Sequence, residues 1–301
     1  MFYKVRTEPI KLQILRVLMT RANPPKNDRT HFSNLQKGYE GEKRFDSYLE
    51  ELTCDCLILN DLLLEYNNST FQIDSLLIVA NRIYLFEVKN LYGDYIQDAD
   101  TIYSSTEREI INPLSQLNRS RIYFSQLLQS LGFDIHVSAS VVFINPEFFL
   151  YQSPLDLPYI FPNQLKRFIS KLNDNKLRLQ KMHRLLADKL LEQHKTELTY
   201  HNLPKYSYDD LRKGITCISC NSFSTVLLGK YVICETCNQK EKASDAVIRS
   251  IKEFKLLFPD QKITTTKVFE WCAGIVPRKR ILAILKQYFN SMGRNRWVYF
   301  E

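Results

Sequence analysis

Glycine and proline are scarce in this chain of 301 residues, with only 8 and 11 copies. Such low numbers exclude a collagen-like or linker-dominated protein. No apolar run is long enough to span a bilayer, and the N-terminal residues lack the apolar stretch and cleavage site of a signal peptide. With 45% hydrophobic and 25% charged residues, the chain can fold into two or three globular domains. We expect a cytoplasmic protein with no membrane partner.

The first two thirds of the chain have no net positive charge. Residues 1–211 carry 25 Lys and Arg against 26 Asp and Glu, whereas residues 212–301 carry 16 against 7. The last third therefore supplies the whole net charge of +8. A basic lobe on a nearly neutral body indicates nucleic acid or another polyanion as partner. The alternative is a solvated, Lys-rich surface.

The seven cysteines do not fit a complete set of disulfides, because their number is odd. Four of them form two Cys-x-x-Cys pairs, namely Cys217, Cys220, Cys234 and Cys237. Four thiolates favour tetrahedral Zn²⁺ and leave it no open position, so the segment is predicted to be a structural zinc ribbon whose hairpin turns near Gly229. A redox pair or an iron site is the alternative. A reducing compartment suits the metal site.

The order of the predicted elements divides the chain into five parts. Residues 1–34 form a basic arm, and residues 35–150 a mixed α/β domain with a helix at 38–52, strands at 56–64, 71–79, 82–89 and 135–144, and a helix from Asn112-Pro113 to about 131. Residues 151–211 form a helical linker region with a polar helix at about 163–195. Residues 212–242 form the zinc ribbon, and residues 243–301 a compact helical tail.

Residues 71–90 combine two strand-like runs with acidic side chains. If Ala80-Asn81 is the turn, Asp74 lies directly opposite Glu87, and Lys89 projects to the same face as Glu87. Two opposed carboxylates repel each other unless a cation lies between them, and Mg²⁺ suits paired carboxylates. A shift of one residue in the register would separate them. The alternative is an edge hairpin with an exposed Glu–Lys pair.

Short motifs in this region resemble the NERD family, the nuclease-related domain. The Asp74 and Glu87-Val88-Lys89 pattern resembles the PD-(D/E)xK signature of restriction-endonuclease-like nucleases, although no proline precedes Asp74. The resemblance covers about residues 35–145 and implies a mixed sheet flanked by helices and metal-dependent phosphodiester cleavage. The cysteine segment and the basic tail are similar to the architecture of bacterial members. The motifs are GYEGE at 38–42, QID at 72–74, FEVKN at 86–90, Gly93, and NPLSQ at 112–116.

Each residue of this group can be given a chemical role. Asp74 and Glu87 would hold Mg²⁺ or Mn²⁺. Lys89 would orient or deprotonate the attacking water and offset the developing negative charge. Glu42 lies on the inward stripe of its helix and would reach the metal or its surroundings; alternatively it stabilises the first helical turn through the helix dipole.

Two further polar residues are less decisive. Gln116 follows the predicted helix start at Pro113, where it would bind a phosphate or a metal-bound water. Alternatively it faces solvent. Asp61 is expected at a strand end rather than among the ligands.

The tail resembles winged-helix modules. Helices are predicted at 243–258, 264–272 and 277–292, followed by a strand or wing at 294–300. The third helix opens with Arg278, Lys279 and Arg280, where a recognition helix makes its groove contacts, and Arg294 and Arg296 would lie on the wing near phosphates. The alternative is a helical bundle that only packs on the zinc ribbon.

These patterns predict a restriction-endonuclease-like α/β domain joined to a zinc ribbon and a winged-helix-like domain. The favoured function is an Mg²⁺-dependent nuclease that cleaves DNA held by the basic lobe. The alternative is a non-catalytic nucleic-acid-binding or regulatory protein that uses the nuclease-like domain as a scaffold.

Overall fold

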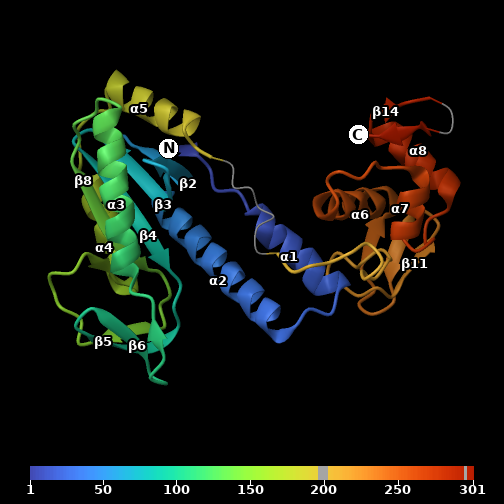
Figure 1. Ribbon diagram of the computed structural model, residues 1–301, viewed down its shortest axis with the longest axis horizontal. Coiled ribbons are helices and arrows are strands. Elements are labelled where there is room, and N and C mark those ends of the chain that lie inside the picture. Colours follow the sequence, from blue (N-terminus) through green and yellow to red (C-terminus); the bar gives the residue numbers. More distant parts are fainter. Residues whose placement is uncertain (196–202, 295–296) are drawn as a thin grey trace. The chain divides into compact units, whose positions relative to one another are not determined.

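A computed structural model describes residues 1–195, 203–294 and 297–301 of the chain (Figure 1). The chain forms two compact units. Unit 1 takes residues 1–8 and the chain from residue 33 to the first gap. Unit 2 takes residues 9–32 and the chain after that gap. Each unit is described by itself below.

Unit 1 is built on a mixed sheet of six strands. Its order is β1-β2-β3-β4-β8-β10; β2, β3 and β4 are antiparallel neighbours, and the other neighbours are parallel. Continuous apolar runs explain why consecutive residues of the central strands β3 and β4 are buried on both faces. The strands are β1 (Phe2–Lys4), β2 (Leu57–Tyr66), β3 (Ser69–Val79), β4 (Arg82–Lys89), β8 (Val137–Phe143) and β10 (Tyr159–Ile160).

Helices cover both faces of this sheet. On one face α3 (Pro113–Ser130) and α5 (Lys181–Glu192) pack on the strands through residues such as Phe124 and Leu186. On the other face α2 (Lys26–Leu49) and α4 (Leu165–Asn173) pack through Phe45 and Ile169. Figure 1 shows α3 lying along the strands. The mixed α/β sheet flanked by helices confirms the predicted fold class.

A second, smaller sheet extends unit 1. Its order is β7-β6-β5-β9, with β5 (Gly93–Asp98) parallel to β9 (Phe148–Tyr151) and antiparallel to β6 (Thr101–Ser104), which pairs with β7 (Glu109–Ile110). This sheet was not among the predicted elements. Its strands are short and mixed in polarity, so they lack the apolar runs that mark the six-stranded sheet.

Unit 2 contains a small sheet, a helical core and a hairpin. The sheet is formed by β11 (Thr225–Leu228), β12 (Tyr231–Cys234) and β13 (Lys240–Lys242). The core is formed by α1 (Ile10–Arg21), α6 (Ala243–Leu257), α7 (Thr265–Trp271) and α8 (Arg278–Tyr288). The hairpin pairs β14 (Ser291–Met292) with β15 (Tyr299–Phe300), and Phe300 also bridges to Ile263.

Several element boundaries differ from the predictions. The polar helix expected at 163–195 is two helices, α4 and α5; between them the Asn175 side chain accepts a 3.0 Å hydrogen bond from the Leu177 amide, a local bond that competes with helix. The helix expected to reach residue 292 ends at Tyr288, because the chain becomes extended at Phe289 (φ −133°, ψ 151°) and enters β14.

The N-terminal segment is more ordered than the basic arm expected at 1–34. β1 joins the edge of the six-stranded sheet of unit 1. Helix α1 belongs to unit 2 and buries Ile14 and Leu18 in a core of that unit. Residues 151–195, expected as part of a linker, pack on the sheet of unit 1 through α4 and α5. Among the helices that the structure describes, none has the length and apolar character to cross a membrane.

Candidate functional site

The β3–β4 hairpin has the register that a turn at Ala80-Asn81 requires. Val79 pairs with Arg82, and the paired positions continue to Ser75 opposite Phe86. The next residue, Asp74, turns its carboxylate toward β4, where Oδ2 accepts a 2.8 Å hydrogen bond from the Val88 amide. Asp74 is therefore held at the level of Glu87 by a bond between its side chain and the backbone of β4.

Glu87 and Lys89 lie side by side at the end of β4. Glu87 is only 2% exposed, and its Oε1 accepts a 2.7 Å hydrogen bond from Lys89 Nζ. The same ammonium donates to Gln116 Oε1 at 3.1 Å. Gln116 reaches it from the first turn of α3, which is fixed by the predicted cap: the Asn112 side chain accepts from the Leu114 amide at 2.9 Å. The structure thus brings Lys89 into contact with two of the predicted site residues.

Glu42 projects from α2 and is held by an arginine that the sequence analysis did not consider. Arg6 donates from its NH1 group to Glu42 Oε2 at 2.6 Å. The same guanidinium forms a forked pair with Asp46, at 2.9 and 3.1 Å, and its side chain is 2% exposed. Arg6 and Asp46 are therefore additional residues of the site region.

Burial raises the pKa values of three carboxyl groups at the site, and like charges add to this effect. Burial, and then the charge of Asp74, raise the pKa of Glu87 to about 8, and the same two causes raise the pKa of Glu42 to about 8. Burial also raises the pKa of Asp74, against the opposing effects of the Val88 amide and of Lys89. The raised pKa values mean that these three carboxyl groups ionise together only when further positive charge is nearby. Their oxygen atoms are the type of ligand that Mg²⁺ prefers.

Asp61 lies opposite Asp74 rather than at a strand end. On β2 the side chains that face α3 change from odd numbers (Leu57, Leu59) to even numbers (Leu62, Leu64), and the change falls at Asn60-Asp61. Asp61 has a left-handed backbone (φ 52°), and the pairing with β3 passes from Asn60 opposite Ser75 to Leu62 opposite Ile73 with no extra residue on either strand. Its Oδ1 accepts from Gln72 Nε2 at 2.9 Å. The predicted strand end was wrong, because Asp61 lies inside β2; its place outside the set of ligands stays a prediction.

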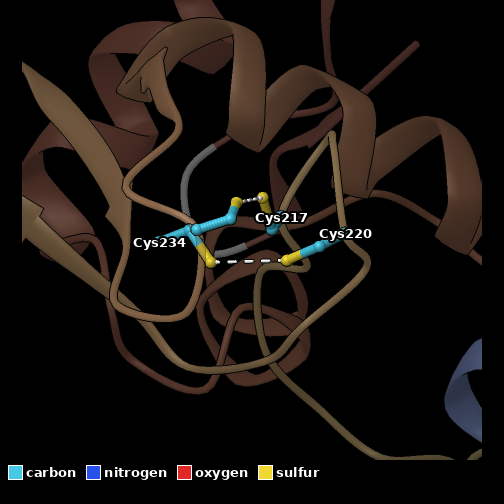
Figure 2. Close-up of side chains that lie close together, drawn as sticks. Cys217, Cys220 and Cys234 are labelled. Atoms are coloured by element: carbon cyan, nitrogen blue, oxygen red, sulfur yellow. Dashed lines mark hydrogen bonds between the residues drawn. The ribbon is translucent and has the colours of Figure 1, made fainter.

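The four cysteines of unit 2 bring their sulfur atoms together. Cys217 and Cys237 sulfurs are 3.5 Å apart, and those of Cys220 and Cys234 are 3.6 Å apart (Figure 2). Tetrahedral zinc with Zn–S bonds of about 2.3 Å would space its sulfurs by about 3.8 Å, close to these distances. The four thiols therefore fit a zinc ion.

The two Cys-x-x-Cys turns share one backbone geometry. In each turn the first sulfur accepts a 3.4 Å hydrogen bond from the amide two residues later, Ser219 or Thr236. In each, the residue after the second cysteine is an asparagine with φ 58°, Asn221 or Asn238. Asparagine adopts this left-handed backbone more readily than most residues. Both turns are therefore built for a common ligand geometry.

Within the described ranges, these cysteines are the one group of three or more His, Cys, Asp or Glu whose ligand atoms all lie within 4.8 Å of one another. The carboxylates of unit 1 are more widely spread. Glu87 turns toward Lys89 and Glu42 toward Arg6. Each of these two carboxyl groups is therefore paired with its own neighbouring cation.

The basic residues predicted to contact nucleic acid differ in their surroundings. Arg278 stacks on Phe269 at 4.6 Å and Arg280 donates to the Gly229 carbonyl at 2.6 Å, so both have contacts within unit 2. Lys279 and Arg294 are exposed. Arg296 lies outside the described residues.

Comparison with known families gives one match. Residues 37–144 match the NERD family, described as the nuclease-related domain. Neither a curated protein nor a solved structure matches the chain. The match spans α3 and the four central strands of the six-stranded sheet, β2, β3, β4 and β8, and it confirms the resemblance carried by the sequence motifs. The chain therefore contains a nuclease-related domain of the NERD family at residues 37–144.

Proposed function

We propose that unit 1 is an Mg²⁺-dependent nuclease that hydrolyses phosphodiester bonds in DNA. The observation that carries this proposal is the pair of buried carboxylates, Asp74 and Glu87, next to the Lys89 ammonium within a nuclease-related domain. Burial of two carboxylates at one level of a sheet is costly when a single ammonium lies beside them, and this supports a metal ion as the further counterion.

The residues divide the work of hydrolysis between them. Asp74 and Glu87 would hold Mg²⁺, or Mn²⁺ in its place, which would supply positive charge for the phosphate and activate water. Lys89 would orient or deprotonate that water and offset the negative charge that develops on the phosphate. Gln116 would fix the Lys89 ammonium through its 3.1 Å contact. Glu42, held by Arg6, would lie in the surroundings of the metal ion.

Unit 2 would hold the DNA. The order of α6, the Ile263 bridge, α7, α8 and the β14–β15 hairpin supports a winged-helix module, because a third strand segment joins the hairpin ahead of the second helix. Lys279 near the start of α8 and Arg294 in the hairpin would contact phosphates. A Zn²⁺ ion on the four cysteines would supply folding energy to a segment too short for its own core. Free thiolates require a reducing compartment, in keeping with the cytoplasm.

Cleavage by the purified full-length protein tests this function. Supercoiled and linear DNA would be incubated with and without Mg²⁺ or Mn²⁺, and with the Glu87→Gln variant. Loss of one ligand charge at constant shape should lower the cleavage rate at least about a hundredfold. The matched control is Glu51→Gln, the same substitution at an exposed carboxylate of unit 1, which should cleave like the unaltered protein.

Equal cleavage by the Glu87→Gln variant would assign the activity to another site or to a contaminant. DNA binding without cleavage under any of these conditions would favour the second candidate, a regulatory binding protein. That candidate has one observation in its favour, since Glu87 and Glu42 already have cationic partners within the chain.

A further inference from the structure

Arg6 enters the candidate site from outside the nuclease-related domain. It follows β1 at the N-terminal end of the chain, whereas the family match begins at residue 37. Besides its bonds to Glu42 and Asp46, its NH2 group donates to the Asp74 carbonyl at 2.8 Å and to Ser75 Oγ at 3.0 Å. The guanidinium therefore links α2 to the point on β3 where Asp74 leaves the regular ladder.

The charges around Asp74 are unbalanced by the protein alone. When all four are ionised, the carboxylates of Glu42, Asp46, Asp74 and Glu87 are opposed by two cations, Arg6 and Lys89. The nearby residues Asp61 and Lys4 add one charge of each sign and leave this difference unchanged; the Lys4 ammonium donates to the Asp61 backbone carbonyl at 2.8 Å. Two negative charges remain. One divalent ion would neutralise them, and a second divalent ion would give the site a net positive charge.

The position of Arg6 decides where that ion can bind. Glu42 gives one oxygen, and Asp46 gives both of its oxygens, to the guanidinium. An arginine stays protonated at all pH values that a protein tolerates, so this cation cannot be lost by titration. A metal ion on the Glu42 side of Asp74 would have to displace a buried group with five hydrogen bonds. On the Glu87 side of Asp74, the neighbouring cation is Lys89, whose side chain is partly exposed.

We propose that Arg6 is a built-in cation that takes the place of a second metal ion, so that the site binds a single divalent ion through Asp74 and Glu87. The inference rests on the proposed function of this site. Arg6 is a positioning residue here: it acts through Glu42 and Asp74 and does not touch the reacting atoms.

Counting Mn²⁺ ions on the full-length, zinc-loaded protein tests the inference without relying on activity. Calorimetric titration or electron paramagnetic resonance should find one Mn²⁺ per chain, and none in Glu87→Gln. Arg6→Gln, which frees Glu42 and Asp46, should bind two. Arg6→Lys keeps the charge and should bind one, which a merely structural role for Arg6 would not predict.

The outcomes separate this inference from the function beneath it. Two ions on the unaltered protein would overturn the single-ion site and leave the nuclease proposal standing, whereas no bound ion would overturn both. One ion on a folded Arg6→Gln variant would also overturn the inference. If that variant does not fold, Glu42→Gln replaces it. Retention of one ion would support the inference, and loss of that ion would contradict it, because Glu42 would then be a ligand.

Discussion

Gly41 of α2 packs directly against Asn90, the residue that follows β4. A Cβ atom at position 41 would lie 2.5 Å from Asn90 Cβ and 3.2 Å from Ile144 Cγ2. Real Cβ atoms do not approach this closely, and Asn90 Cβ cannot swing away because it is attached to the backbone. The contact sets how near α2, and with it Glu42, comes to the end of the strand that carries Glu87 and Lys89.

Gly41→Ala should therefore disturb the site through packing. We expect the added methyl group to push α2 away from β4, to cost about 1–3 kcal/mol of stability as overpacking does, and to lower cleavage. Thermal unfolding and cleavage rates measure both effects. Gly38→Ala is the matched control: it lies in the same helix with nothing within 4 Å, and it should stabilise the protein by about 0.5–1 kcal/mol. Equal behaviour of the two variants would show that the Gly41 contact has no bearing on the site.

Removal of the ammonium at position 89 should affect catalysis more than folding. Lys89→Ala should lower the cleavage rate about 10²–10³-fold, the range for loss of one preorganised electrostatic group. Gln116→Ala should have a smaller effect in the same direction, because it only fixes Lys89. Lys166→Ala, an exposed lysine on α4, serves as the control. A Lys89→Ala variant that retains full activity would exclude the assigned role.

The stability of the metal-free site should fall as pH rises. Glu42 and Glu87 have pKa values raised from 4.5 to about 8 in the folded protein, by burial and by Asp74. Between about pH 5 and about pH 8 the folded state therefore holds more protons than the unfolded state, and stability is lost with increasing pH. Thermal unfolding of zinc-loaded protein without Mg²⁺ should show this decline.

Two comparisons make the pH prediction specific. Added Mg²⁺ should raise the unfolding temperature more at about pH 8 than at about pH 5, because only ionised carboxylates bind it. Glu87→Gln should show a shallower decline, since it removes one of the titrating groups. An unfolding temperature that rises with pH in the unaltered protein would contradict the crowding of these carboxylates.

Zinc should be required by unit 2 and not by unit 1. Cys234→Ser removes a buried ligand, so freshly purified variant should lack stoichiometric zinc and lose order around residues 212–242. DNA binding should weaken accordingly. The six-stranded sheet should remain folded because it has its own cores. Elemental analysis together with hydrogen exchange measures both parts; loss of exchange protection in β2 and β3 would contradict the independence of unit 1.

DNA binding through unit 2 should depend steeply on salt. Each phosphate contact contributes about 0.9 to the slope of log K against log salt concentration. Lys279→Ala should weaken binding to all sequences and reduce this slope by about one if the lysine contacts a phosphate. Lys181→Ala, an exposed lysine at the start of α5, should leave the slope unchanged. A slope insensitive to Lys279, and to Arg294→Ala, would argue against this surface.

The sequence was informative where local chemistry determines structure. A two-residue turn leaves one register for its strands, so the pairing of Val79 with Arg82 could be counted from the turn. The Asn112 cap of α3 and the Thr264 cap of α7, which accepts from the Lys267 amide at 3.2 Å, follow from residue preferences at helix starts. The approach of the four sulfurs follows in the same way from the spacing of the cysteines.

Other parts of the site depend on contacts that no local pattern reveals. Arg6 lies 36 residues from Glu42 and 68 from Asp74 along the chain. Nothing in the local sequence around Arg6 indicates that it contacts residues so far away. Asp61 is different, because the polar pair Asn60-Asp61 interrupts an otherwise apolar run in the sequence. That interruption coincides with the left-handed backbone of Asp61 inside β2.

The first 32 residues are divided between the two units, and this division has a consequence for synthesis of the protein. Helix α1 is made early, yet its apolar residues Ile14 and Leu18 are buried against Phe254 and Leu257. At about 5–20 residues per second on the ribosome, α1 waits on the order of 10–50 s for that partner surface to emerge. During this time it is an exposed apolar segment, so a chaperone that shields nascent chains would act on it. Fragments that begin at residue 33 or at residue 203 would lack Arg6 or α1, and neither would reproduce its unit of the native protein.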